Sequence, residues 1–208
     1  MKESHLAQLL STALTRLNID TNRTSELLAF VYLLEKWNKT YNITAIRDLE
    51  QMVILHVIDS ASVYGHLSGA SILDVGTGGG IPGIIFAILN PQLNVCLLDS
   101  SQKKTRFLRY AKRDLNIDNI TIVCDRVEKY QPKHLFDVVI SRAFTEVGNY
   151  LQLAGHLCKP NGHVLAMKGP RVESEDNVAK TGFELSKEID IQVPFLDATR
   201  RLLIFNKT

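Results

Sequence analysis

The chain has 208 residues, 45% of them hydrophobic and 22% charged, with a formal net charge of +2, which fits one α/β domain with a short extension. The longest apolar runs are too short to cross a bilayer, and the first ten residues lack the apolar stretch of a signal peptide, so we expect no membrane association. Three cysteines without disulfide or metal-ligand spacing predict no metal site and favour the cytoplasm, and the small net charge leaves nucleic-acid binding to a local basic surface.

The first third of the chain, residues 1–69, is predicted to form a helical extension. Apolar residues recur at helical spacing over residues 6–17 and again over residues 24–37. A third helix is predicted over residues 48–67, because Asp48 begins a pattern that resembles a capping box.

Residues 70–208 alternate between short apolar runs and helical patterns, which predicts a parallel sheet with right-handed crossovers. Strands are expected at Ser71–Val75, Asn94–Leu98, 120–124, 136–140 and 162–167, with helices at 81–89, 101–115, 127–130 and 146–158. Two further strands, 184–193 and 200–205, are expected to form an antiparallel pair at one edge. The predicted fold class is therefore α/β, a single Rossmann-like domain (1–208) with a seven-stranded, mostly parallel sheet and helices on both faces.

The sharpest motif is a glycine-rich loop, Asp74 to Gly83, between the first predicted strand and a helix. Glycines let a backbone turn tightly and approach a ligand, and ligands of such sheets bind at the carboxyl ends of the strands. Asp99 ends the second strand, 21 residues after Gly78, close to the roughly 20 residues expected for an acid that binds ribose hydroxyls. Loop and acid together predict a nucleoside-containing cofactor; the alternative is a structural turn beside a solvated acid.

The loop also fits the pattern of dinucleotide-binding proteins, so the cofactor needs a separate argument. Asp74 lies two residues before Gly76, where a carboxylate suits the cationic S-adenosylmethionine and would repel a pyrophosphate. The chain also leaves little room for a second, substrate-binding domain, which makes a nicotinamide oxidoreductase the weaker alternative. After the third strand, residues 125–128 would either hold an adenine edge or simply begin a helix.

Arg142 ends the fourth strand, at a position that faces both cofactor and substrate in a doubly wound sheet. The sequence lacks the Asn/Asp-Pro-Pro-aromatic motif of many enzymes that methylate exocyclic base nitrogens, and the Pro-Cys pair needed to methylate C5 of cytosine. An arginine suits guanine, whose O6 and N7 it can bind bidentately, but it would also suit a phosphate, the cofactor carboxylate or a structural ion pair. Further cations that would bind RNA or form a solvated face are Lys168, Arg171, Arg200, Arg201 and six basic residues within 103–113.

Polar side chains in the predicted extension are the remaining candidates. His56, Asp59 and Ser60 share one face of the third helix, where they either line the pocket or form a buried polar cluster. Residues 37–44 are predicted to be a polar, aromatic-bearing loop that suits unstacked RNA, and Asn42 within it is a candidate substrate contact.

These features resemble one known family over roughly residues 30 to 170. The family is that of the bacterial small-subunit ribosomal RNA guanine-N7 methyltransferases, also called the glucose-inhibited division protein B family. The matching motifs are Trp37-Asn38, Asn42-Ile43-Thr44, His56-Val57-Ile58-Asp59-Ser60, the 74–83 loop, Leu98-Asp99-Ser100, Lys104, Arg106-Phe107-Leu108, Arg126-Val127-Glu128, Ser141-Arg142-Ala143 and Lys168-Gly169.

The resemblance implies a class I methyltransferase that transfers a methyl group from S-adenosylmethionine to N7 of guanine 527 in 16S ribosomal RNA, within free RNA or the small subunit. It implies that Asp99 binds the cofactor ribose and that the cofactor is contacted by Gly76, Ile81, Val127, Glu128 and Arg142. The tail departs from the family pattern, because Arg200 follows Ala198-Thr199 where many members have Gly-x-Arg.

N7 of guanine carries a lone pair and no proton, so the expected reaction is a direct displacement that needs no general base. Arg142 and Lys168 are predicted to orient guanine or cofactor, while His56, Asp59 and Arg200 are predicted substrate contacts. Two alternatives stay open: methylation of a ribose 2′-hydroxyl with Lys168 as the base, and a non-catalytic RNA-binding assembly factor. We expect a monomer.

Overall fold

The computed structural model describes residues 2–142, 146–169, 178 and 181–208. Its α-helices are α1 (Lys2–Arg16), α2 (Thr24–Tyr41), α3 (Leu49–Met52), α4 (Asp59–Ala61), α5 (Gly83–Leu89), α6 (Gln102–Asp114) and α7 (Val147–Ala154). Shorter helical segments are η1 (Thr21–Arg23), the π-helical η2 (Val53–Ile58), η3 (Tyr64–His66) and η4 (Gly155–Leu157). The strands are β1 (Ser71–Val75), β2 (Asn94–Leu98), β3 (Ile120–Val123), β4 (Phe136–Ser141), β5 (Cys158–Lys168), β6 (Phe183–Ile191) and β7 (Arg200–Lys207).

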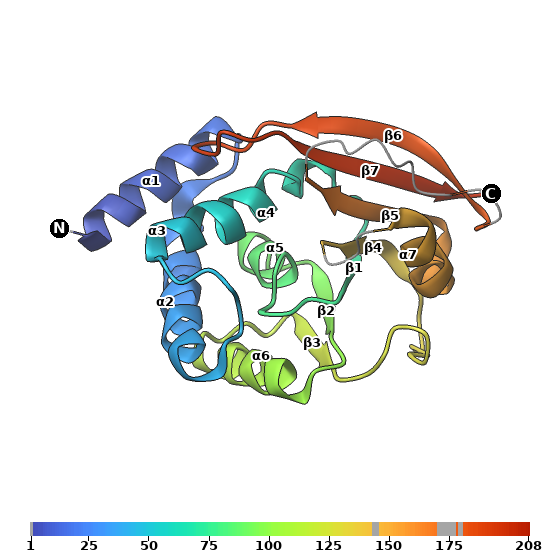
Figure 1. Ribbon diagram of the computed structural model, residues 1–208, viewed down its shortest axis with the longest axis horizontal. Coiled ribbons are helices and arrows are strands. Elements are labelled where there is room, and N and C mark those ends of the chain that lie inside the picture. Colours follow the sequence, from blue (N-terminus) through green and yellow to red (C-terminus); the bar gives the residue numbers. More distant parts are fainter. Residues whose placement is uncertain (1, 143–145, 170–177, 179–180) are drawn as a thin grey trace.

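The described strands form one seven-stranded sheet in the order β3-β2-β1-β4-β5-β7-β6 (Figure 1). The pairs from β3 through β5 are parallel, whereas β7 runs antiparallel to both β5 and β6. The predicted α/β class, the number of strands and the antiparallel tail are confirmed. The strand order reverses between β1 and β4, so their carboxyl ends form the switch point at which such sheets bind ligands.

Side chains along the inner strands alternate between two buried clusters, as the two-residue period of a strand requires. Ile72 of β1 and Leu97 of β2 belong to the cluster beneath α1–α6. Leu73 and Leu98 belong to the cluster that α7 covers on the other face. Figure 1 shows α7 apart from the other helices, and the sheet is therefore covered on both faces.

The N-terminal helices share the larger core with the sheet. Helix α1 contacts α2 and η2, and α2 contacts α5 and α6. The Trp37 ring of α2 contacts two aromatic rings of α6, with centroids 5.5 Å from Phe107 and 5.1 Å from Tyr110. The predicted extension thus packs directly against helices α5 and α6, which cover one face of the sheet.

Two sequence predictions about local structure are wrong. Residues 37–41 are helical rather than part of a loop, because the contacts of Trp37 with α6 carry α2 on to Tyr41, after which Asn42 ends the helix with a left-handed φ of 47°. The predicted helix over residues 127–130 is only a turn, closed by the Tyr130 amide donating to the Arg126 carbonyl at 3.1 Å. Pro132 follows too closely for that turn to continue.

The third predicted helix forms with one irregularity that matters for the site. Its N-cap is confirmed, since Asp48 Oδ1 accepts a hydrogen bond from the Gln51 amide at 2.9 Å. Between α3 and α4 the turn widens into the π-helical η2, where the Asp59 amide bonds to the Ile54 carbonyl five residues earlier. Such insertions shift side chains around the helix axis and are frequent at functional sites. His56 lies within η2, and Asp59 follows it directly as the first residue of α4.

Candidate functional site

The glycine-rich loop follows β1 and depends on left-handed backbone conformations. Gly76, Gly78 and Gly80 have φ values of 69°, 61° and 91°, which glycine adopts without steric cost. Asp74 is fully buried at the base of the loop. Its Oδ2 accepts hydrogen bonds from Thr77 Oγ1 at 2.6 Å and from the Gly83 amide at 2.8 Å. The Asp74 carboxylate therefore joins the two ends of the loop.

Replacing Gly83 with alanine should damage the loop. The new Cβ would overlap the Leu97 side chain and lie 2.8 Å from Asp74 Oδ2, so we expect the free energy of unfolding to fall by about 1–2 kcal/mol. We also expect weaker binding of S-adenosylmethionine by calorimetry. Gly65→Ala is the matched control, because its Cβ would meet no atom within 4 Å, and its stability should stay within about 0.5 kcal/mol of the wild type.

The buried position of Asp74 changes its proton affinity. Burial raises the pKa of Asp74 from 3.8 to about 6, against the opposing hydrogen bonds from Thr77 and Gly83 and the positive charge of Arg142. Among the described residues, its Oδ1 has no hydrogen-bond partner. The loop therefore holds a carboxylate that is costly to ionise.

This shift predicts a pH dependence. A carboxyl whose folded pKa is raised contributes stability that is complete below its unfolded pKa and is lost as the pH rises through the folded value. Between pH 4 and 7 the stability of the wild type relative to Asp74→Asn should therefore fall, by about 2–3 kcal/mol. Urea unfolding of both proteins across this range measures the difference, and a pH-independent difference would contradict the raised pKa.

Asp99 ends β2 beside the loop. Its Oδ2 accepts a hydrogen bond from the Gly78 amide at 2.9 Å, and its Oδ1 accepts one from the Ser101 amide at 2.8 Å. Lys104 Nζ lies 3.6 Å from Oδ2. Asp99 thus connects the loop to the start of α6, at the carboxyl ends of the two strands from which the sequence predicts cofactor binding.

A cavity of about 190 Å³ opens over the loop, and we call it the glycine-loop cavity. Its lining residues are Ile43, Thr44, His56, Gly76, Thr77, Gly78, Gly79, Ile81 and Arg142. Backbone groups of four consecutive loop residues line it, and an arginine supplies positive charge. These features fit a ligand that combines an apolar body with an anionic group. Four of the predicted cofactor contacts do not line this cavity. Asp74 and Asp99 are buried and hydrogen-bonded to the loop backbone. Val127 packs against the α7-side core, and Glu128 is exposed, 3.6 Å from Arg126.

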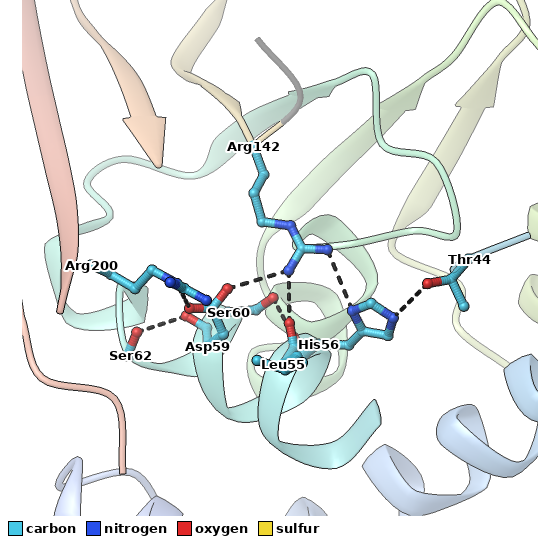
Figure 2. Close-up of polar contacts among 8 residues, drawn as sticks. All are labelled: Thr44, Leu55, His56, Asp59, Ser60, Ser62, Arg142 and Arg200. Atoms are coloured by element: carbon cyan, nitrogen blue, oxygen red, sulfur yellow. Dashed lines mark hydrogen bonds and ion pairs between the residues drawn. The ribbon is translucent and has the colours of Figure 1, made fainter. Parts of the chain in front are cut away.

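Arg142 extends from the end of β4 and makes contacts in three directions. Its Nη1 donates to the Leu55 carbonyl at 2.8 Å and lies 3.3 Å from Asp59 Oδ2, while Nη2 lies 3.4 Å from His56 Nδ1 (Figure 2). All three partners belong to the widened helix. Ala143 and Phe144, which follow it in the motif, lie outside the described residues, as does Arg171.

Asp59 connects Arg142 to the C-terminal tail. Arg200, at the start of β7, donates from Nε to Asp59 Oδ1 at 3.0 Å. The Asp59 side chain is 4% exposed, whereas those of Arg142 and Arg200 are 30% and 26% exposed. Figure 2 shows the carboxylate between the two guanidinium groups. One buried anion thus contacts two partly exposed cations, Arg142 after β4 and Arg200 at the start of β7.

A second cavity, of about 290 Å³, shares Arg142 and His56 with the first, and we call it the arginine cavity. Its lining residues are Ile46, Leu55, His56, Asp59, Ser62, Val63, Arg142, Met167, Lys168, Gly169, Arg200 and Arg201. Arg142 and His56 line both cavities, so the cavities adjoin at these two side chains, and we call this shared boundary the wall. The two alternatives for His56 and Asp59 are therefore both partly right, because these side chains are buried polar groups that also line a pocket.

His56 is held in its neutral form. Burial lowers the pKa of His56 from 6.5 to about 4, and the positive charge of Arg142 adds to this effect, while the Leu55 backbone opposes it. The other ring nitrogen, Nε2, lies 3.0 Å from Thr44 Oγ1. At neutral pH the wall between the cavities is thus a neutral imidazole beside a charged guanidinium.

Sequence reasoning missed the residues that hold the 42–46 loop. Asn38 is buried, its amide nitrogen donates to the Ile46 carbonyl at 2.9 Å, and its side-chain oxygen accepts from the Thr44 amide at 2.9 Å. An asparagine on the apolar face of an amphipathic helix must find hydrogen-bond partners when buried, and this signal in the sequence could have predicted the two bonds to the loop. The predicted substrate contact Asn42 is exposed, accepts a hydrogen bond from Arg47 Nη2 at 2.8 Å, and lines neither cavity.

Comparison with known proteins gives the family. The model of the family described as "GidB: rRNA small subunit methyltransferase G" matches residues 23–204. The chain belongs to the ribosomal RNA small subunit methyltransferase G family. Its relatives include two proteins named "Ribosomal RNA small subunit methyltransferase G". The one from Nitrosococcus oceani is 46% identical, over 89% of this chain and 86% of the relative. The one from Methylobacillus flagellatus is 44% identical, over 95% of this chain and 97% of the relative.

Solved structures agree on the fold of this methyltransferase G family member. The glycopeptide N-methyltransferase MtfA, in complex with S-adenosylmethionine, matches with a TM-score of 0.62 at 11% identity, over 74% of this chain and 94% of that one. The mitomycin 7-O-methyltransferase MmcR matches with a TM-score of 0.61 at 14% identity, over 78% and 56%. At such identities the likeness shows the fold alone.

These comparisons confirm the predicted family. They also confirm that the enzyme is a methyltransferase and that S-adenosylmethionine is its methyl donor. The donor combines an apolar adenosine with a charged amino-acid part, which fits the lining of the glycine-loop cavity. Within the part of the chain that the structure describes, no helix is long and apolar enough to cross a membrane.

Proposed function

We propose that this enzyme methylates N7 of guanine 527 in 16S ribosomal RNA, and that the arginine cavity receives the guanine. The observation that carries this proposal is the shared wall. Arg142 and His56 line both cavities, so a base in one cavity lies beside a donor in the other. Apolar residues such as Met167 and Val63 would contact the base, while the cations of the arginine cavity favour anionic RNA.

The polar groups at the wall suit a reaction that needs no proton transfer. N7 attacks the methyl carbon with its own lone pair, and the rate depends on holding the two groups aligned at about 3–3.5 Å. His56 is neutral and hydrogen-bonded at both ring nitrogens, and the Asp59 carboxylate is engaged by two arginines. These residues are arranged to position the guanine and the methyl donor rather than to remove a proton from a substrate.

The proposed chemistry restricts how an arginine can bind the guanine. The bidentate contact with O6 and N7 that arginine makes in sequence recognition would occupy the lone pair that must attack the methyl group. We therefore propose that Arg142 or Lys168 donates to O6 or to a phosphate and leaves N7 free. His56, Asp59 and Arg200 would shape the cavity, and the exposed Asn42 would contact RNA outside it.

The test is methyl transfer to 16S ribosomal RNA, supplied as free RNA and as small subunits, with labelled S-adenosylmethionine. Chemical cleavage should break the product strand at guanine 527, because N7-methylguanine makes the strand labile. A methylated ribose would resist this cleavage and would replace the proposal by 2′-O methylation. RNA binding without any transfer would indicate a non-catalytic assembly factor.

We further propose that the enzyme acts as a cytoplasmic monomer. The ribosomal RNA target in the family description supports the cytoplasmic location, and the monomeric state is the expectation from the sequence. Light scattering on the purified protein tests the oligomeric state, and a dimer at micromolar concentration would contradict it.

A further inference from the structure

The wall between the cavities contains a directed chain of hydrogen bonds. It begins at Arg142, whose guanidinium can only donate. Since Arg142 Nη2 lies 3.4 Å from His56 Nδ1, that ring nitrogen is the acceptor. The single proton of the neutral imidazole is then on Nε2.

The chain continues to Thr44. With its proton on Nε2, His56 donates to Thr44 Oγ1 at 3.0 Å. The Thr44 oxygen also accepts a hydrogen bond from the Ile46 amide at 3.2 Å. A hydroxyl oxygen has two acceptor lone pairs, and both are now used.

The Thr44 hydroxyl proton is therefore directed away from these partners. Thr44 lines the glycine-loop cavity, and none of the described residues accepts a hydrogen bond from its hydroxyl. The Asn38 amide fixes the Thr44 backbone, so the hydroxyl group is held in place before any ligand arrives. The cavity thus offers a ligand one hydrogen-bond donor of fixed direction.

The positive charge of Arg142 beside the Thr44 hydroxyl indicates which group of a ligand would accept its hydrogen bond. Arg142 lines the same cavity and would repel the sulfonium and ammonium groups of S-adenosylmethionine while attracting its carboxylate. We infer that Thr44 is a cofactor-binding residue whose hydroxyl donates a hydrogen bond to the carboxylate of the amino-acid part of S-adenosylmethionine. This inference rests on the identity of the methyl donor and is independent of the RNA position that receives the methyl group.

The test compares two ligands and three variants by calorimetry. Thr44→Val keeps the shape and removes the donor, and should weaken S-adenosylmethionine binding by about tenfold or more, since a hydrogen bond to a carboxylate is lost. Binding of decarboxylated S-adenosylmethionine should change by less than about twofold. Thr44→Ser keeps the hydroxyl and should recover most of the affinity for the carboxylated ligand. Thr40→Val, on the exposed end of α2, is the matched control.

Three results would overturn the inference. Thr44→Val could bind S-adenosylmethionine as the wild type does, or it could weaken both ligands equally, which would point to a structural role. Nitrogen-15 NMR of the free protein could also place the His56 proton on Nδ1. If the wild type itself binds neither ligand, the assignment of the donor fails instead.

Discussion

Asp59→Ala should lose about 2 kcal/mol of folding free energy and reduce methyl transfer by about a hundredfold. The substitution leaves Arg142 and Arg200 facing each other without the carboxylate that separates them. Removing one member of a buried ion pair commonly costs 3–5 kcal/mol. We expect less because both arginine side chains are about a quarter to a third exposed, and water screens them. The catalytic loss is expected because Arg142 would move from its place at the wall. A small misalignment of the reacting groups costs about two orders of magnitude in rate.

Urea unfolding and single-turnover transfer measure the two effects of Asp59→Ala separately. Asp59→Asn should fall between the wild type and the alanine variant, because its amide oxygen can still accept from one arginine while its NH₂ group faces the other. The exposed Asp118 provides the control substitution, Asp118→Ala. Wild-type stability and activity in Asp59→Ala would show that the two arginines are positioned by other contacts.

Arg142→Ala should lower kcat/KM for methyl transfer by about a thousandfold while the protein stays folded. Its side chain lines both cavities, so its loss should weaken donor binding and the alignment of the base together. The cost in stability should be about 1 kcal/mol, because the Leu55 carbonyl loses a donor but Asp59 keeps its bond to Arg200.

Arg142→Lys distinguishes the contribution of the positive charge at this position from that of the hydrogen-bonding geometry. An ammonium group restores the charge but cannot reproduce the planar fork that donates to Asp59, His56 and the Leu55 carbonyl at once. We therefore expect Arg142→Lys to stay at least about tenfold below the wild type in kcat/KM. Circular dichroism checks the fold and calorimetry the donor affinity. Unchanged kcat/KM in Arg142→Ala would remove this residue from the mechanism.

Local patterns in the sequence were enough to predict the sheet and the loop. Buried parallel strands read as short apolar runs, and only glycines supply the positive φ angles that the loop needs at Gly76, Gly78 and Gly80. Asp99 was placed correctly at the end of β2 because strand ends are local features. The end of α2 was predicted wrongly because it depends on a non-local contact, that of Trp37 with a helix some 70 residues away in sequence.

The wall between the cavities could not be predicted because its contacts join distant segments. Arg200 and Asp59 are 141 positions apart, and Arg142 and Asp59 are 83 apart. The π-helical η2 was not predicted from the helical hydrophobic pattern, yet it contains His56 and ends directly before Asp59. Thr44 looked like one polar residue in a loop until its two hydrogen-bond donors were known.

The shared wall also bears on how the product leaves. For the reaction we propose, the donor arrives with a positive sulfur and departs neutral, while the methylated guanine becomes a cation. One unit of positive charge thus passes from the glycine-loop cavity to the arginine cavity, which is lined by Arg142, Arg200 and Lys168. The same side chains that draw in an uncharged base on an anionic strand would then push against the modified one, so turnover would be assisted by electrostatic repulsion of the finished nucleotide.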